Sequence, residues 1–318
     1  MKKIYFLILI FQISSAQKKT FEILKSIKIE TEYKNQVDFY KWYYDSVFYE
    51  KARLTKEFEC LQVNYKSDTA KVEAWLYKPV EVKNIKLPLI IYNRGGMGNF
   101  GNLVEANLVD FHKMAENGYV VLATKTRFAG VNGKYDQHGG IDINDIVNLK
   151  DIYENLDYID TSNVFMYGFS RGGQNTYQAS LRMKLNAMVV TAGTTDWLSR
   201  VDDRKEFEDG WTDEDKSMEY LGFRKVFADW NTKKENILKE RSAIYWADKI
   251  NTPVLILHSR LDNKVPCLDA LKMINKLQEY NKVYKAIIYD EPSHSLPFSQ
   301  FDSYDQMFIW FERFKNKK

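Results

Sequence analysis

The sequence predicts an α/β fold in which a mostly parallel sheet of eight strands is flanked by helices. Short apolar runs of strand length alternate along the chain with stretches of helical spacing, a rhythm typical of parallel strands joined by crossover helices. The chain has 318 residues and 45% apolar content, which is enough to bury a large core. No internal repeat or low-complexity linker divides it, so we expect one main domain with additions.

The predicted elements follow one another over residues 57–318. Two antiparallel edge strands are expected at Phe58–Tyr65 and Lys71–Tyr77. The core strands are expected at Leu89–Asn93, Tyr119–Thr124, Val164–Phe169, Ala187–Thr191, Val254–Leu257 and Tyr284–Tyr289. Helical patterns lie between several of these strands, at Leu103–Asn117, Ile143–Leu156 and Gln174–Leu185.

Residues 17–56 precede the main domain and are predicted to form a helical extension packed against it. Within Phe21–Leu54, aromatic residues such as Phe39, Trp42 and Phe48 recur with helix-like spacing. We therefore expect one apolar face of this extension to lie on the domain.

Residues 202–240 interrupt the alternation between the strands predicted at Ala187–Thr191 and Val254–Leu257. The segment is dense in charge and includes Trp211, Tyr220 and Trp230. Two interpretations stay open, a cap insertion over a site and a solvated surface insertion. The second is considered because charge-rich stretches usually lie on the solvent-exposed surface.

Residues 1–16 have the pattern of a cleaved secretory signal. A basic start, Met1-Lys2-Lys3, precedes the apolar run Ile4–Ile13 and the small residues Ser14-Ser15-Ala16. The apolar run is short for a bilayer span, so no stable membrane anchor is expected. These features predict export, to a periplasm or the medium.

Ser170 is the candidate nucleophile. It stands in the pentapeptide Gly168-Phe169-Ser170-Arg171-Gly172, directly after the apolar run Val164–Tyr167 and before a helical stretch. A G-x-S-x-G sequence between a strand and a helix is typical of a sharp, strained turn that exposes the serine hydroxyl, and the glycines leave space for close helix packing. The competing interpretation is an ordinary glycine-rich turn.

A serine hydroxyl needs a neighbouring base, and His294 is the candidate. It lies in a loop after the strand predicted at Tyr284–Tyr289. Of the other three histidines, His112 lies in a helical stretch, His138 in a loop, and His258 at a strand end where it could shape a turn.

Asp262 is the candidate acid that orients the base. It follows the strand predicted at Val254–Leu257, whereas the rival carboxylate Asp290 is closer to His294 in sequence. Ser170, Asp262 and His294 all follow strands, where open α/β sheets build their sites. Their order along the chain, Ser, Asp, His, is that of α/β-hydrolases.

The oxyanion of an acyl-transfer intermediate needs two preorganised N–H donors. The backbone N–H of Arg171, directly after the nucleophile, is the first candidate. The second is Gly95, in the sequence Arg94-Gly95-Gly96-Met97-Gly98 that follows a predicted strand. Glycines there allow the main chain to approach a substrate closely.

These motifs together resemble the catalytic domain of the prolyl oligopeptidase family of serine peptidases, from about Leu87 to the C-terminus. The similar segments occur in the family's order, at Tyr92–Gly96, Tyr167–Gly173, Ser242–Asp248, Pro253–Pro266 and His294. The resemblance implies an α/β-hydrolase fold and acyl transfer through Ser170, Asp262 and His294.

The same resemblance implies two substrate contacts. Trp197, in Thr194-Thr195-Asp196-Trp197, is expected to line the pocket for the residue before the scissile bond. Several members carry a tyrosine before the glycine of the oxyanion loop, where this chain has Arg94. Arg94 is accordingly a candidate substrate-binding residue. Larger members also carry an N-terminal β-propeller, which we do not expect within these 318 residues.

Composition and motifs exclude several other functions. The net charge of +3 is nearly balanced and no basic cluster occurs, so we expect no nucleic-acid partner. The sequence lacks H-E-x-x-H, C-x-x-C and Walker A patterns, so catalysis is expected to need no metal and no cofactor. Cys60 and Cys267 could form one disulfide or remain two buried thiols.

The function predicted from these observations is cleavage of short peptides by an acyl-enzyme mechanism on Ser170. An esterase acting on carboxylic or carbohydrate-linked esters uses the same triad, so it remains the alternative. The other class is a binding protein on a hydrolase scaffold that has lost catalysis. A site that has lost catalysis has no physical reason to keep a strained turn together with a matched acid and base.

Overall fold

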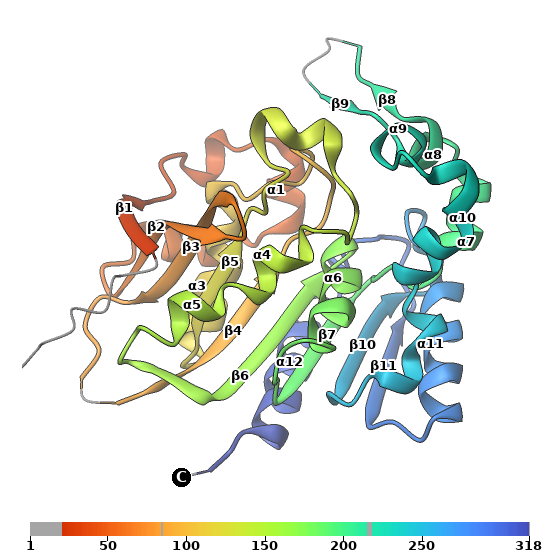
Figure 1. The fold of residues 1–318 in the computed structure, drawn as a ribbon. Helices are drawn as coiled ribbons and strands as arrows, with labels where there is room; N and C mark the ends of the chain where they lie inside the picture. Colours follow the sequence, from red (N-terminus) through yellow and green to blue (C-terminus); the bar gives the residue numbers. More distant parts are fainter. Residues whose placement is uncertain (1–20, 84, 215–217, 318) are drawn as a thin grey trace, which may run out of the picture.

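The computed structural model describes residues 21–83, 85–214 and 218–317 (Figure 1). A nine-stranded sheet crosses it in the order β1-β2-β3-β5-β4-β6-β7-β10-β11. The strands from β5 to β11 in this order are parallel, and β1, β2 and β3 are antiparallel at one edge. Their bounds are β1 Phe21–Ile27, β2 Phe58–Ser67, β3 Ala70–Pro79, β4 Leu87–Asn93, β5 Val120–Thr124, β6 Ile159–Phe169, β7 Ala187–Thr191, β10 Val254–Ser259 and β11 Tyr284–Tyr289.

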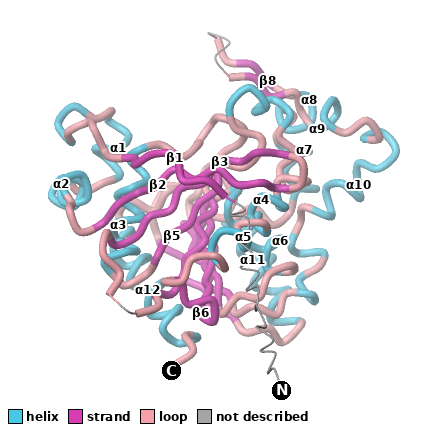
Figure 2. Tube along the Cα trace, turned by 60° about the vertical axis from the view of Figure 1, so that its left-hand side comes forward, coloured by secondary structure: helices cyan, strands magenta, loops and turns pink. Residues whose placement is uncertain are grey.

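Helices cover both faces of this sheet, as Figure 2 shows. One apolar core lies under α4, α5, α6 and α11, and the other under α2, α3 and α12. Their bounds are α2 Ser46–Leu54, α3 Leu108–Glu116, α4 Ile143–Val147, α5 Lys150–Tyr153, α6 Arg171–Ser180, α11 Cys267–Glu279 and α12 Gln300–Phe314. Four 3-10 turns complete this part, at η2 Glu105–Asn107, η3 Gly130–Tyr135, η4 Ala243–Tyr245 and η5 Ala247–Lys249. The predicted fold, a mostly parallel sheet flanked by helices, is confirmed.

Each central strand supplies both cores because successive side chains point to opposite faces. In β4, Leu89 and Ile91 lie in one core, while Ile90 and Tyr92 lie in the other. This is why the strands appear in the sequence as continuous apolar runs without polar alternation.

The N-terminal segment differs from its prediction. Residues Phe21–Ile27 form strand β1, which pairs antiparallel with β2 and adds a ninth strand to the sheet. The helical prediction is wrong for these residues, since the aromatic spacing on which it rested lies further along the chain. Helices do follow, at η1 Tyr33–Asn35, α1 Asp38–Tyr43 and α2. The signal sequence predicted for residues 1–16 lies outside the described residues.

A second small body lies beyond the carboxyl ends of β7 and β10 (Figure 1). It has its own apolar cluster, to which Trp197, Phe207, Phe223 and Trp230 contribute. Its elements are α7 Trp197–Asp203, α8 Glu206–Asp209, β8 Trp211–Thr212, β9 Glu219–Tyr220, α9 Phe223–Val226 and α10 Trp230–Glu240. Residues 197–240 are called the cap segment below. Across all the described ranges, no helix combines the length and apolar character needed to cross a membrane.

Candidate active site

Ser170 stands at the junction of β6 and α6 with φ 57° and ψ −122°. A positive φ at a non-glycine residue is strained, and it turns the chain sharply from strand to helix. The flanking glycines make this turn possible by close approach. A Cβ on Gly168 would lie 2.1 Å from the carbonyl oxygen of Gly172, and one on Gly172 would lie 2.0 Å from that of Asn93.

The side chains of His294 and Asp262 are hydrogen-bonded. Nδ1 of His294 lies 2.6 Å from Oδ2 of Asp262. The other carboxylate oxygen of Asp262 accepts hydrogen bonds from the backbone N–H groups of Lys264, at 2.8 Å, and Val265, at 2.9 Å. The structure therefore brings together the acid and base that were chosen from sequence, at the ends of β10 and β11.

The pKa of Asp262 lies well below its ordinary value. Burial alone would raise it, but hydrogen bonds from His258, His294 and the Val265 backbone favour the ionised carboxylate and outweigh burial. Asp262 is thus an anion throughout the neutral pH range. An anion on Nδ1 fixes the tautomer in which Nε2 of His294 is free to accept a proton.

His258 is a further partner of Asp262 that the sequence interpretation missed. It is fully buried, and its Nε2 lies 2.9 Å from the carbonyl oxygen of Val265 and 3.4 Å from Oδ2 of Asp262. Since a carbonyl only accepts, Nε2 carries the proton here. The spacing of four residues between His258 and Asp262, across the end of a strand, was the only sequence signal for this contact.

The remaining parts of the predicted site lie beside Ser170. The ring of Phe169 is 4.9 Å from the imidazole of His294, centroid to centroid. A Cβ built on Gly95 would come within 3.3 Å of the Ser170 Cβ, so the glycine-rich loop abuts the serine. Arg171 is the first residue of α6, where backbone N–H groups have no partner within the helix.

The side chain of Arg171 is buried in an ion-pair network that sequence reasoning did not predict. Its guanidinium donates to Asp136 at 2.5 and 2.7 Å and to Asp142 at 2.6 Å. Burial disfavours the charge, but these two carboxylates raise the pKa of Arg171 above its ordinary value. Asp136 also accepts from the N–H of Gly98 at 2.6 Å, so one carboxylate joins the start of α6 to the glycine-rich loop.

Arg94 is oriented into its own loop. Its guanidinium donates to the carbonyl oxygens of Gly95, at 3.0 Å, and Gly98, at 2.7 Å. Burial, and then the nearby charge of Arg171, lower the pKa of Arg94 to about 10. This geometry does not support the direct substrate contact expected for Arg94, because both terminal nitrogens of its guanidinium already donate to carbonyl oxygens of the loop.

Trp197 lies inside the cap segment and is 2% exposed. Its indole N–H donates to Oε1 of Gln174 at 2.6 Å, and its ring packs on His138, Phe207 and Phe223. So little accessible surface does not support a pocket-lining role, and packing accounts for the residue. The aromatic spacing of the cap segment carried no information on which rings face inward.

His138 is the other residue whose position was not foreseen. It is buried among four aromatic rings, and within the described ranges neither ring nitrogen has a hydrogen-bond partner. Burial, together with the charge of Arg171, holds the pKa of His138 well below its ordinary value, so the imidazole is neutral. A loop prediction gave no indication of this burial.

The described residues contain neither a candidate metal site nor a disulfide. In the part of the chain that the structure describes, no group of three or more His, Cys, Asp or Glu side chains is disposed to hold a metal ion. Cys60 is buried in β2 and Cys267 is half-buried at the start of α11, and both are free thiols.

Comparison with protein families gives a match over the same region. The sequence model of the prolyl oligopeptidase family matches residues 109–318, which include all three triad candidates. The resemblance found from the motifs is thereby confirmed.

The chain is also similar to curated peptidases. It is 28% identical over 243 residues to the dipeptidyl-peptidase 5 of Aspergillus oryzae, which covers 72% of this chain and 32% of that protein. It is 25% identical over 241 residues to an uncharacterized peptidase of Bacillus subtilis, covering 72% of this chain and 34% of the relative. The chain thus spans about one third of the length of these relatives.

Solved structures share the fold. An acylaminoacyl peptidase in complex with Z-Gly-Gly-Phe-chloromethyl ketone superimposes with a TM-score of 0.66 at 22% identity, over 83% of this chain and 43% of that one. Porphyromonas gingivalis dipeptidyl peptidase 4 gives a TM-score of 0.63 at 19% identity, over 84% of this chain and 37% of that one. These similarities show that the fold is the α/β-hydrolase fold of such peptidases.

Proposed function

The chain belongs to the prolyl oligopeptidase family, and from this membership we propose that it is an exported serine peptidase that cleaves amide bonds of short peptides through an acyl-enzyme on Ser170. The observation that carries the proposal is the 2.6 Å hydrogen bond between His294 and Asp262, formed beside a strained serine. The curated relatives named as peptidases support amide hydrolysis over ester hydrolysis.

The proposed first step is acylation. Ser170 Oγ attacks the scissile carbonyl carbon while Nε2 of His294 accepts the hydroxyl proton. The N–H groups of Gly95 and Arg171 donate to the oxygen that becomes negative, and Asp262 stabilises the imidazolium. The C–N bond then breaks as His294 returns the proton to the leaving amine.

Deacylation repeats these roles with water. Nε2 of His294 takes a proton from a water molecule, whose oxygen attacks the acyl carbon and forms the carboxylic acid. The bond to Ser170 Oγ breaks, and the serine recovers its proton from His294. Both steps use the same ionised Asp262, so the acid never needs to change its protonation state.

Loss of the serine tests the nucleophile. A fluorophosphonate probe should label the wild type at Ser170, and Ser170→Ala should lose activity by roughly 10⁴ to 10⁶-fold. Ser180→Ala, at the other end of α6, is the matched control and should be labelled normally. Labelling at another residue, or activity retained in Ser170→Ala, would rule out this triad.

A substrate panel tests the bond that is cleaved. The purified protein is incubated with a library of short peptides and with carboxylic and carbohydrate-linked esters, and products are identified by mass spectrometry. Peptide cleavage that Ser170→Ala abolishes supports the proposal. Turnover of esters alone would assign the same triad to an esterase, and no turnover with no labelling would indicate a binding protein.

Export is proposed on the sequence of residues 1–16 alone. N-terminal sequencing of the protein recovered outside the cytoplasm should give a chain that starts at Gln17. A cytoplasmic protein that keeps residues 1–16 would contradict this part of the proposal and leave the peptidase assignment untouched.

A further inference from the structure

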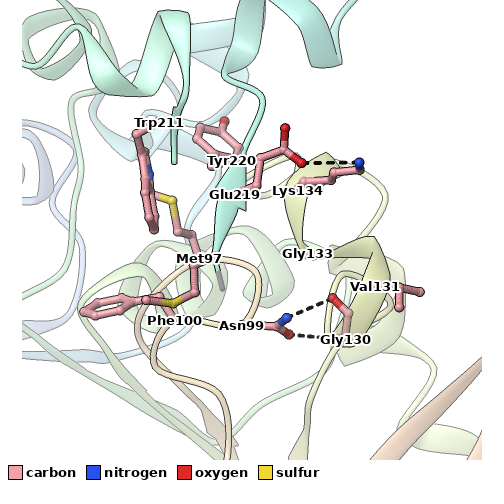
Figure 3. A pocket seen from close by; sticks show the side chains of 11 residues that line it. Met97, Asn99, Phe100, Gly130, Val131, Gly133, Lys134, Trp211, Glu219 and Tyr220 are labelled. Carbon is pink, nitrogen blue, oxygen red and sulfur yellow. Dashed lines mark hydrogen bonds and ion pairs between the residues drawn. The ribbon is translucent and has the colours of Figure 1, made fainter. Parts of the chain in front are cut away.

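A hollow of about 520 Å³ lies between the glycine-rich loop, η3 and the β8–β9 hairpin of the cap segment (Figure 3). Its apolar lining comes from Met97 and Phe100 of the loop, Val131 of η3, and Trp211 and Met218 of the cap segment. In Figure 3, Trp211 and Phe100 lie on one side of the hollow, with Val131 across from them. The volume is that of a small-molecule site.

The hollow begins close to the reacting atoms. A Cβ built on Gly95 would lie 3.3 Å from the Cβ of Ser170, and Gly95 is two residues before Met97. Arg171 holds the residue between them, because its guanidinium donates to the carbonyl oxygen of Gly96 at 3.3 Å. Two residues of extended chain span roughly 7 Å, so the hollow is within reach of the substrate residues next to the scissile bond.

The charged and amide side chains that line the hollow, Lys134, Glu219 and Asn99, are already paired. Lys134 and Glu219 form an ion pair at 3.3 Å across its rim. Asn99 exchanges two hydrogen bonds with Gly130, donating to its carbonyl oxygen at 2.9 Å and accepting from its N–H at 2.5 Å. Among the described residues of the lining, the charges of Lys134 and Glu219 are therefore paired with each other, while the interior offers thioether and aromatic surface that adapts to irregular apolar groups.

We propose that this hollow is a substrate subsite that binds a bulky apolar side chain of the peptide, with Trp211 as the residue that sets the preference. The proposal rests on the proposed peptidase function. Trp211 is the largest ring of the lining and is only half-buried, so it has surface to offer a ligand. Its strand β8 pairs with β9, in which the buried residue Tyr220 lies opposite Trp211.

Variants of Trp211 test this subsite. Peptides that carry Gly, Ala, Leu or Phe at each of the two positions on either side of the scissile bond are compared by kcat/KM. Trp211→Ala should lower kcat/KM by roughly 10 to 200-fold for Leu or Phe at one of these positions and much less for Gly. Trp211→Phe should keep most of the preference, and Trp42→Ala, an exposed tryptophan outside the hollow, is the matched control.

Equal losses for small and large side chains, or no loss, would overturn the subsite. A second measurement does not depend on peptide cleavage. The rates at which a methyl and a benzyl fluorophosphonate label Ser170 are compared, because a subsite for apolar groups should favour the benzyl probe. If Ser170 is labelled but no peptide is cut, the peptidase proposal fails, and the subsite stands only if Trp211→Ala slows the benzyl probe selectively. If peptides are cut without that selectivity, the subsite alone is wrong.

Discussion

At the scale of single residues, the fold determines which carboxylate, Asp262 or Asp290, pairs with His294. Two carboxylates compete for His294, and the nearer one in sequence, Asp290, has a side chain that is 78% exposed and pairs with Arg260 at 2.6 Å. Asp262 lies 32 residues before His294 in the sequence, yet it is buried and makes the hydrogen bond. Asp262 and His294 meet because they follow the neighbouring parallel strands β10 and β11, whose carboxyl ends lie at the same edge of the sheet.

Replacing each carboxylate in turn tests this assignment. Asp262→Asn should reduce kcat by roughly 10³ to 10⁴-fold with the fold intact, because an amide in place of the anion favours the wrong tautomer of His294. Asp290→Asn should leave kcat nearly unchanged, since the side chain is exposed and faces Arg260. Steady-state kinetics with circular dichroism checks both, and a crippled Asp290→Asn would reverse the assignment.

Residue types and strand positions were enough to predict that Asp262 and His294 lie together and that Ser170 occupies a sharp turn, because each of these residues follows an apolar run. They were not enough for Arg94 and Trp197. Whether a side chain faces a substrate or its own loop depends on donors and carbonyl groups that only the folded chain positions, as for Arg94 with Gly98. Tertiary burial likewise turned Trp197 inward.

At the scale of elements, Asp136 connects two segments that must keep a fixed distance. It binds Arg171 at the start of α6 and the N–H of Gly98 in the glycine-rich loop. Since the proposed oxyanion donors belong to these same two segments, Asp136 is a positioning residue for them. No sequence motif announces it, because it lies 35 positions before Arg171 in an irregular stretch.

Asp136→Asn should therefore lower kcat by roughly 10 to 100-fold with little change in KM, because small displacements of catalytic groups are costly. Asp142→Asn is the matched control, since Asp142 binds Arg171 but does not contact Gly98. A similar loss of kcat in both variants would show that Arg171, and not the link to the loop, is what matters. Urea unfolding of each variant separates lost activity from lost stability.

Burial and strand pairing explain which helices and strands could be predicted from the sequence and which could not. The parallel strands were evident because both of their faces are buried. Strand β1 was not, since five of its seven residues are exposed and it joins the sheet only by pairing with β2. The helix predicted over Ile143–Leu156 is divided into α4 and α5, a break that helical spacing alone does not reveal.

For the whole molecule, Asp110 joins parts of the chain that are far apart in sequence. This buried residue of α3 accepts hydrogen bonds from the hydroxyl of Tyr44, near the N-terminal helices, at 2.8 Å, and from that of Tyr304 in α12 at 2.7 Å. Burial raises the pKa of Asp110 to about 6, although the two hydroxyls and Lys113 favour the anion. The link between the N-terminal segment and α12 therefore depends on pH.

The sign of this dependence follows from proton linkage. The folded chain holds the Asp110 proton more tightly than the unfolded chain, whose pKa is near 3.8, so the stabilisation is fully present below about pH 4 and is lost as pH rises through about 6. At 1.36 kcal/mol per pKa unit, the loss amounts to about 3 kcal/mol. In urea unfolding from pH 4 to pH 8, Asp110→Asn should lack this loss and gain stability relative to the wild type as pH rises, whereas Asp290→Asn should follow the wild type. Parallel curves for Asp110→Asn and the wild type would show that Asp110 does not titrate in this window.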